Sequence, residues 1–380
     1  MNNYTFKILS LTIAAATIVS AETSIINDEV QSCTSNKQTT QLLEPTSYFP
    51  QKTRQIVEAA NSISTKAVSI DEYPTIDISP WLNSSYTDSE RRNVVLQVLE
   101  QATGAGSFNI VGHEVPINLL NRLESSSAQF FRGETIATKN EYIIQTPGSQ
   151  TGYIPFANEA LSIIHQTDHA LELSDLRELY SVIYPPSYHT NIVAPDYFQI
   201  AMNEYMDFLQ SVENALESIM SQALTISKGV EADLHEDSPL STGLLKVSHY
   251  TKQSSEYDGA NKLLAHSDWS SMTILYAQQD GLEEIRDGRW VNVPMNKGEL
   301  HVSIGELYTV WSNELFTNNI HRVSSQAVDD RLSFAYFFGQ GQKEGSRYMK
   351  PIVAATEVPK FPKWSTLTQM ATYSEALKPL

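Results

Sequence analysis

Cysteine is almost absent from the sequence, since Cys33 is the only one in 380 residues. A single cysteine excludes an intramolecular disulfide and a metal cluster held by thiolates. Basic residues are also few, because 26 lysines and arginines stand against 44 acidic residues, for a formal net charge of −18. No block of lysine or arginine occurs, which disfavours a surface that follows nucleic-acid phosphates. Any metal must therefore be held by histidine and carboxylate ligands, and nucleic acid is not an expected partner.

Long apolar runs are missing as well, apart from residues 8–21. This run is shorter than the about 20 residues of a membrane-spanning helix, and it ends in the small residues VSA, which are typical of signal-peptide cleavage. We therefore expect residues 1–21 to be a signal peptide that sends the protein into the secretory pathway or out of the cell, without a stable membrane anchor. The alternative is an apolar N-terminal helix on a cytoplasmic protein. The glycosylation sequon at 83–85 matters only in the first case.

Composition and periodicity divide the rest of the chain into four parts. Residues 22–69 are rich in Ser, Thr, Gln and Asn, which indicates a low-complexity linker. Residues 70–235 mix short strands with helical patterns, and residues 240–345 carry many short strands separated by turn signals. Residues 346–380 end in another helical pattern. Many short strands without long helices between them favour a jelly roll. The expected fold class is α+β: a jelly-roll core, an N-terminal mixed helical region and a C-terminal helix.

The expected elements follow from apolar spacing of three or four residues for helices and of two residues for strands. We expect helices over 87–106, 118–133, 195–228 and 362–378. Strands are expected within 73–82 and over 107–112, 244–250, 263–277, 281–293, 298–306, 320–325 and 331–339.

The expected strand over 263–277, "LLAHSDWSSMTILYA", carries two polar residues in an apolar setting. His266 and Asp268 are two positions apart, so a strand would present both side chains on one face. His321, in "NNIHRVSS", is the best candidate for a third ligand. Two histidines and one carboxylate on one face are typical of a non-haem Fe(II) oxygenase. An HxD tripeptide also arises by chance, and by itself it more often marks a hydrogen-bonded surface pair.

A second motif follows ten residues after His321, and it favours the metal interpretation. Arg331 and Ser333 are again two apart in an expected strand, and a guanidinium with a neighbouring hydroxyl suits a carboxylate ligand. A buried arginine without a partner would be costly. The alternative is a local ion pair between Arg331 and Asp329 or Asp330.

Taken together, these motifs resemble the isopenicillin N synthase-like branch of the 2-oxoglutarate and Fe(II)-dependent dioxygenases, from about residue 73 to the C-terminus. The specific part of the resemblance lies in "AHSDWSSMTILY", "GLEEIRDGRWVNVP", "IGELYTVWSNELFTNNIHRV" and "RLSFAYFF". Weaker support comes from "YPTIDIS", "GAGSFNIVGHEVP" and "DLRELYSV". The sequence departs from the family pattern at Ser248, Ser303, Glu306 and Glu314. The resemblance implies a double-stranded β-helix, which is the jelly roll already expected.

The resemblance also implies an enzyme that oxidises a small organic molecule with Fe(II), 2-oxoglutarate and O2, releasing succinate and CO2. Hydroxylation is the default outcome. The implied iron ligands are His266, Asp268 and His321, and the implied 2-oxoglutarate ligands are Arg331, Ser333 and Tyr250.

Two other functions stay open at this point. One is a non-haem iron oxidase of the same fold that does not use 2-oxoglutarate. The other is a non-catalytic secreted binding protein, although such a protein would not need this set of residues. Tyr153, Phe156 and Phe338 are candidates for contacting the substrate, with ordinary core or rim packing as the alternative. We expect a monomer.

Overall fold

The structure is a computed structural model. It describes residues 59–60, 63, 66–144, 151–157, 175–184, 194–232, 243–252, 260–268, 270–325, 327, 330–338 and 351–361. The expected signal peptide, Cys33, most of the expected linker and the expected C-terminal helix at 362–378 lie outside these residues.

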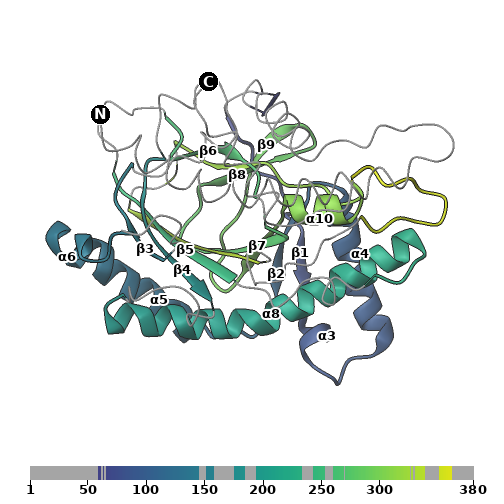
Figure 1. The fold of residues 1–380 in the computed structure, drawn as a ribbon, viewed down its shortest axis with the longest axis horizontal. Coiled ribbons are helices and arrows are strands. Elements are labelled where there is room, and N and C mark those ends of the chain that lie inside the picture. Colours follow the sequence, from purple (N-terminus) through teal and green to yellow (C-terminus); the bar gives the residue numbers. More distant parts are fainter. Residues whose placement is uncertain are drawn as a thin grey trace, which may run out of the picture.

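Two sheets form the centre of the molecule (Figure 1). The large sheet has the order β1-β2-β10-β7-β12-β5-β4-β3, and the small sheet has the order β6-β11-β8-β9. All strand pairs are antiparallel except β1 with β2. The strands of the large sheet are β1 Thr75–Asp77, β2 Ser107–Val111, β3 Gly152–Ile154, β4 Glu178–Tyr184, β5 Gly243–Tyr250, β7 Met272–Ala277, β10 Leu300–Ile304 and β12 Arg331–Phe337. Those of the small sheet are β6 Leu263–His266, β8 Leu282–Arg286, β9 Arg289–Asn292 and β11 His321–Val323.

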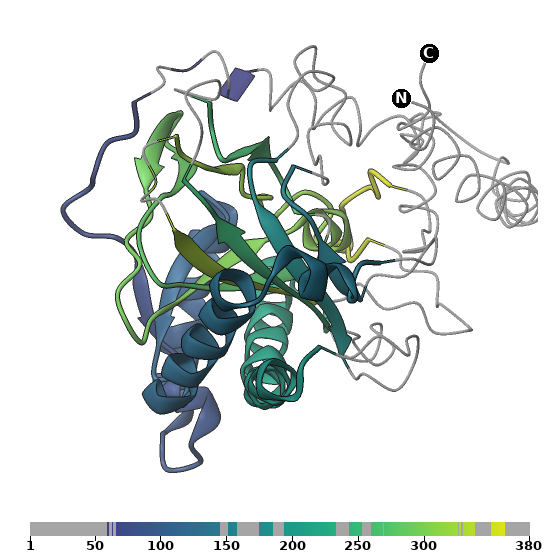
Figure 2. The ribbon, with the colours of Figure 1, turned by 90° about the vertical axis from the view of Figure 1, so that its left-hand side faces the viewer.

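Helices cover one face of the large sheet, as Figures 1 and 2 show for α5 and α8. Helix α4 begins with a capping box in which the Thr87 side chain accepts from the backbone N–H of Glu90 and the Glu90 side chain accepts from that of Thr87. The helices are α3 Ser79–Leu82, α4 Asp88–Thr103, α5 Ile117–Ala128, α6 Ile136–Asn140, α8 Asp196–Lys228 and α10 Glu306–Trp311, with a π-helix, η1, at Gln129–Gly133.

Alternation along β12 separates the helical face of the large sheet from the opposite face. Phe334 packs on Tyr205 of α8, and the hydroxyl of Tyr336 accepts a hydrogen bond of 2.7 Å from Gln210 of α8. Because successive side chains of a strand point to opposite faces, Arg331 and Ser333 lie on the face turned away from α8. The hydrophobic core under the helices thus fixes where these two polar residues point.

One expected element is wrong in its extent, because the strand over 263–277 is two strands in different sheets. β6 ends at His266, and β7 begins at Met272. Between them the chain crosses from the small sheet to the large one, and it passes so close to Gly305 that a Cβ there would lie 1.9 Å from the carbonyl oxygen of Ser270. Asp268 therefore lies in the crossing and not on a strand face beside His266.

Two further expected elements are divided. The helix over 118–133 is α5 followed by the π-helix η1. The strand over 281–293 is the hairpin of β8 and β9, whose turn residues Asp287 and Gly288 have φ values of 51° and 72°. Positive φ at both positions is the geometry that favours Asp-Gly in a two-residue hairpin turn.

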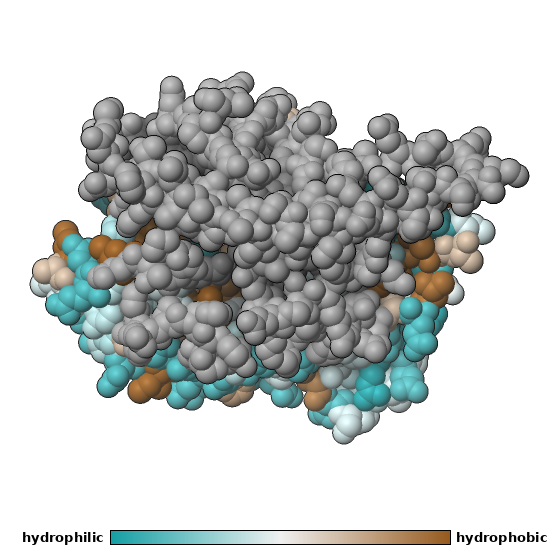
Figure 3. All heavy atoms as spheres, viewed as in Figure 1, coloured by the Kyte–Doolittle hydropathy of each residue, from teal (hydrophilic) through white to brown (hydrophobic). Residues whose placement is uncertain are grey.

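The surface along α5 and α8 is mainly hydrophilic with isolated apolar side chains (Figure 3). Ile200 of α8 is 57% exposed. Among the described residues, no helix combines the length and the apolar character needed to cross a membrane.

Candidate metal and co-substrate site

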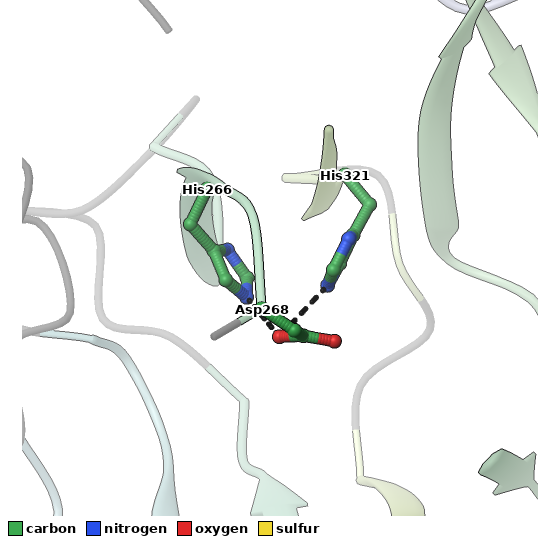
Figure 4. Close-up of side chains that lie close together, drawn as sticks. All are labelled: His266, Asp268 and His321. Atoms are coloured by element: carbon green, nitrogen blue, oxygen red, sulfur yellow. Dashed lines mark ion pairs between the residues drawn. The ribbon is translucent and has the colours of Figure 1, made fainter. Parts of the chain in front are cut away.

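The three expected iron ligands come together at one end of the small sheet (Figure 4). His266 is the last residue of β6, His321 is the first residue of β11, and the two are directly paired across the strands. Their rings lie 4.3 Å apart between centroids. Asp268 reaches the same point from the crossing between the sheets. One ligand atom from each residue can be chosen so that all lie within 4.8 Å of one another.

The spacing of these atoms is that of ligands around an ion and not that of a hydrogen-bonded triad. Oδ1 of Asp268 lies 3.7 Å from Nε2 of His266 and 3.7 Å from Nε2 of His321. Both distances exceed a hydrogen bond. All three side chains are buried. Two imidazole nitrogens and a carboxylate oxygen are the donor set suited to non-haem Fe(II), so the residues present fit this metal.

Neighbouring groups turn two of these ligands toward the common point. Nδ1 of His266 lies 2.7 Å from the carbonyl oxygen of Leu264, which can only accept, so the proton is on Nδ1 and Nε2 carries the lone pair that can bind a metal. The hydroxyl of Thr273 donates to Oδ2 of Asp268 over 2.6 Å, which leaves Oδ1 facing the two histidines. The backbone of Asp268 is held by the N–H of Glu306, which donates to its carbonyl oxygen over 2.8 Å.

The expected 2-oxoglutarate ligands lie on two adjacent strands of the large sheet, in matching register. Arg331 of β12 is paired with Tyr250 of β5, and Ser333 is paired with Ser248. The guanidinium of Arg331 lies over the Tyr250 ring, 5.3 Å from its centroid. We refer to these four residues as the co-substrate wall.

The buried surroundings of Arg331 suit the binding of an anion by its guanidinium. It is 1% exposed, and its Nε donates to the carbonyl oxygen of Gln279 over 2.9 Å. Its Nη1 and Nη2 have no hydrogen-bond partner among the described residues. Burial lowers the pKa of the guanidinium. Because an unpaired buried cation is costly, these two donors fit the carboxylate of a bound acid.

The alternative partner Asp330 is engaged elsewhere. Its Oδ1 accepts from Nε of Arg132 over 2.6 Å and lies 2.7 Å from Nε2 of His249. Asp329 lies outside the described residues.

The sequence interpretation missed one residue of the wall's surroundings. Nη1 of Arg177 lies 3.1 Å from Oγ of Ser248 and 3.5 Å from the hydroxyl of Tyr250. Arg177 is buried and also pairs with Asp175 over 3.8 Å. Its motif, "DLRELYSV", carried too little signal, because only the pairing of β4 with β5 brings it to the wall.

The three substrate candidates differ in their surroundings. The hydroxyl of Tyr153 donates to Glu178, and its ring packs edge-on against Phe130. Phe338 is fully buried and packs on Tyr336 in the main core. Both placements favour packing roles for these two residues. Phe156 is half-buried next to β3. Contact with a substrate stays a prediction for all three.

Two family models match the chain, the 2OG-Fe(II) oxygenase superfamily over residues 242–340 and the N-terminal region of the non-haem dioxygenases in morphine synthesis over residues 73–198. The chain belongs to the 2-oxoglutarate and Fe(II)-dependent oxygenases, in their isopenicillin N synthase-like branch. The oxygenase is thus an enzyme that uses Fe(II), 2-oxoglutarate and O2, as the sequence predicted.

Relatives of the oxygenase are found among plant and fungal enzymes. It is 28% identical over 309 residues to 1-aminocyclopropane-1-carboxylate oxidase homolog 3 of Arabidopsis thaliana, covering 80% of this chain and 79% of the relative. It is 25% identical over 309 residues to a bi-functional coumaroyl CoA and feruloyl CoA ortho-hydroxylase of Ipomoea batatas, covering 78% of each.

Solved structures show the same fold. A full-length protein of Neurospora crassa in complex with alpha-KG superposes on the oxygenase with a TM-score of 0.67 at 21% identity, over 83% of this chain and 99% of that one. JOX2 in complex with 2OG, Fe and JA gives a TM-score of 0.65 at 21% identity, over 82% and 87%. The jelly roll expected from the sequence is confirmed.

Proposed function

We propose that this oxygenase hydroxylates a small organic molecule, with Fe(II) held by His266, Asp268 and His321. The observation that carries the proposal is the convergence of these three buried side chains from two strands and a crossing, with ligand atoms within 4.8 Å. Bound Fe(II) supplies the activation of O2, coupled to the conversion of 2-oxoglutarate to succinate and CO2.

The co-substrate wall supplies the second half of the proposal. Arg331 offers two donors from a buried guanidinium, which suits the far carboxylate of 2-oxoglutarate. Ser333 adds a hydroxyl on the same face two residues later, and Tyr250 supports the guanidinium with its ring. Burial of these groups excludes water from the carboxylate, which strengthens the interaction.

Hydroxylases among the relatives support hydroxylation as the outcome. One is named as an ortho-hydroxylase of coumaroyl and feruloyl thioesters. By analogy with this relative, the substrate of the oxygenase would be a molecule with an aromatic or apolar part that carries the C–H bond to be hydroxylated.

The test is an anaerobic titration of the purified protein with Fe(II) and then 2-oxoglutarate. We expect a weak visible charge-transfer band when the keto acid chelates the iron. The band should be absent in Arg331→Ala at the 2-oxoglutarate concentration that saturates the wild type, while Fe(II) binding remains.

Two outcomes would contradict the proposal. If Fe(II) binds and O2 uptake does not depend on 2-oxoglutarate, the chain is an oxidase without this co-substrate. If Fe(II) does not bind, the three ligand candidates are wrong. The family and the unpaired donors of Arg331 favour neither alternative.

A further inference from the structure

A chain of charged side chains runs behind the co-substrate wall, on the helical face of the large sheet. Its centre is His249, which lies between Ser248 and Tyr250 on β5 and therefore points to the opposite face from both. The ring is buried and packs on Phe131 of η1, with 5.4 Å between ring centroids.

Each ring nitrogen of His249 faces a carboxylate. Nδ1 lies 2.8 Å from Oε1 of Glu178, and Nε2 lies 2.7 Å from Oδ1 of Asp330. An ionised carboxylate only accepts hydrogen bonds, so His249 can bond to both carboxylates at once only by donating from both ring nitrogens. Burial raises the pKa of Glu178 and of Asp330, but hydrogen bonds outweigh it and both pKa values are lowered.

Both carboxylates are also held from their other sides. Glu178 accepts from Nζ of Lys139 over 2.6 Å and from the hydroxyl of Tyr153. Arg132 donates two hydrogen bonds to Asp330, from Nε to the carboxylate over 2.6 Å and from Nη2 to the backbone carbonyl over 2.8 Å. The chain of contacts thus joins α6, η1, β3, β4 and β5 to the turn before β12.

That turn has an uncommon backbone conformation at Asp330. Its φ is +66°, in the left-handed region that residues with a side chain seldom adopt, although Asp adopts it more often than most. Asp330 is followed directly by Arg331, so the direction in which β12 begins depends on this conformation. Arg132 and His249 hold it from two sides.

We propose that His249 is a positioning residue for the co-substrate: it holds Asp330 and thereby aims the guanidinium of Arg331 over Tyr250. The inference rests on the proposed function, in which Arg331 binds the carboxylate of 2-oxoglutarate. His249 touches neither the co-substrate nor the iron, and it acts through the turn that precedes Arg331.

The experiment compares His249→Gln with a matched control, His113→Gln, in the full chain. His113 is buried to the same 4%, and its ring contacts the carbonyl oxygen of Gly298 and the N–H of Val115, away from the wall. Anaerobic titrations give the Kd for Fe(II) and the Kd for 2-oxoglutarate of each variant, and succinate release gives KM and kcat.

We expect His249→Gln to raise the Kd and KM for 2-oxoglutarate about tenfold, because hydrogen bonds to charged groups are lost. Its Kd for Fe(II) and its kcat at saturating 2-oxoglutarate should stay within about twofold of wild type, since two of the expected iron ligands are in the small sheet and the third is in the crossing between the sheets. His113→Gln should leave the Kd for 2-oxoglutarate unchanged.

Coupling provides a readout that a merely structural role would not give. If His249 acts through Asp330, the effects of His249→Gln and Asp330→Ala should not add. The double variant should then have a Kd for 2-oxoglutarate no higher than that of whichever single variant binds it more weakly. If His249→Gln does not fold, Arg132→Gln removes the other support of Asp330 from a 36% exposed side chain and should raise the Kd about threefold.

The outcomes separate the two proposals. If Arg331→Ala abolishes 2-oxoglutarate binding while His249→Gln and Arg132→Gln both bind it as wild type does, His249 is not a positioning residue. If Arg331→Ala itself binds 2-oxoglutarate normally, the proposed function of the wall fails.

Discussion

The expected metal ligands and the co-substrate wall lie in different parts of the fold and are supported in different ways: two of the ligands are in the small sheet and the third is in the crossing between the sheets, whereas the wall is in the large sheet. His266 and Asp268 are oriented by groups close in sequence, the carbonyl of Leu264 and the hydroxyl of Thr273. The wall is held by residues from far along the chain, such as Arg177 and, through Asp330, Arg132. The difference teaches that the side-chain orientation of His266 and Asp268 is encoded locally, whereas the geometry of the wall depends on the packing of the whole large sheet.

The largest expected effect is the loss of Fe(II) binding. Asp268→Ala deletes the only carboxylate of the triad, so we expect Fe(II) affinity and turnover to fall by more than about a hundredfold, beyond the loss typical of a supporting residue. Metal content after anaerobic dialysis and succinate release measure this. Far-ultraviolet circular dichroism controls for folding, and full iron occupancy would contradict the assignment of Asp268.

The next effect concerns the wall alone. Arg331→Lys keeps a positive charge but loses the planar fork, so the Kd for 2-oxoglutarate should rise at least about tenfold. Its Kd for Fe(II) should stay near that of wild type. An equal loss of both affinities would show that the two regions are not separable.

A smaller effect tests local support of the metal ligands. Thr273→Val removes the hydroxyl that donates to Oδ2 of Asp268, and we expect Fe(II) affinity to fall about tenfold. Thr309→Val is the matched control, because Thr309 is also buried but its hydroxyl contacts only the carbonyl of Gly305 among the described residues. Equal Fe(II) affinities in the two variants would argue against this support.

The next prediction concerns how the stability of the fold depends on pH through Glu178, which pairs with His249 behind the wall. Hydrogen bonds hold the pKa of Glu178 in the folded protein below its usual value of about 4.3. The ionised carboxylate therefore stabilises the fold fully above that pH. This stabilisation is lost as the pH falls through the lower pKa of the folded state. Glu178→Gln should destabilise the fold at pH 7 by about 2 kcal/mol in urea unfolding. This deficit should shrink at pH 3, and a deficit independent of pH would contradict the ionised pair.

The smallest effect concerns the secretory route, which stays a proposal. Asn83 and Ser85 are exposed, so the sequon is accessible to modification if residues 1–21 direct the chain into a secretory compartment. Asn83→Gln should abolish a glycosidase-sensitive shift in gel mobility of the secreted protein and leave turnover unchanged. Retention of the unshifted wild-type protein in the cytosol would favour the alternative.

The sequence predicted the parts of the site that depend on short motifs. His266, Asp268 and His321 were found because an HxD pattern and a later histidine lie among apolar β-forming residues, and the structure brings them together. The strand assumed under Asp268 was wrong, because the apolar residues on either side belong to two strands, and the polar residues Ser267, Asp268, Ser270 and Ser271 between them mark the crossing from one sheet to the other. The roles of Arg177 and His249 could not be predicted from the sequence. Their partners are set by the register between β4, β5 and β12 and by the turn at Asp330.

The order of the large sheet has a consequence for producing parts of this protein. Strands from residues 240–345 occupy its middle, while β2 adds to β10 on one side and β4 adds to β5 on the other. A shortened chain of residues 240–345 would therefore expose two unprotected backbone edges, together with the apolar face that α8 now covers. Such edges pair with other molecules, so this fragment should aggregate during expression even though it contains all six of the expected ligands.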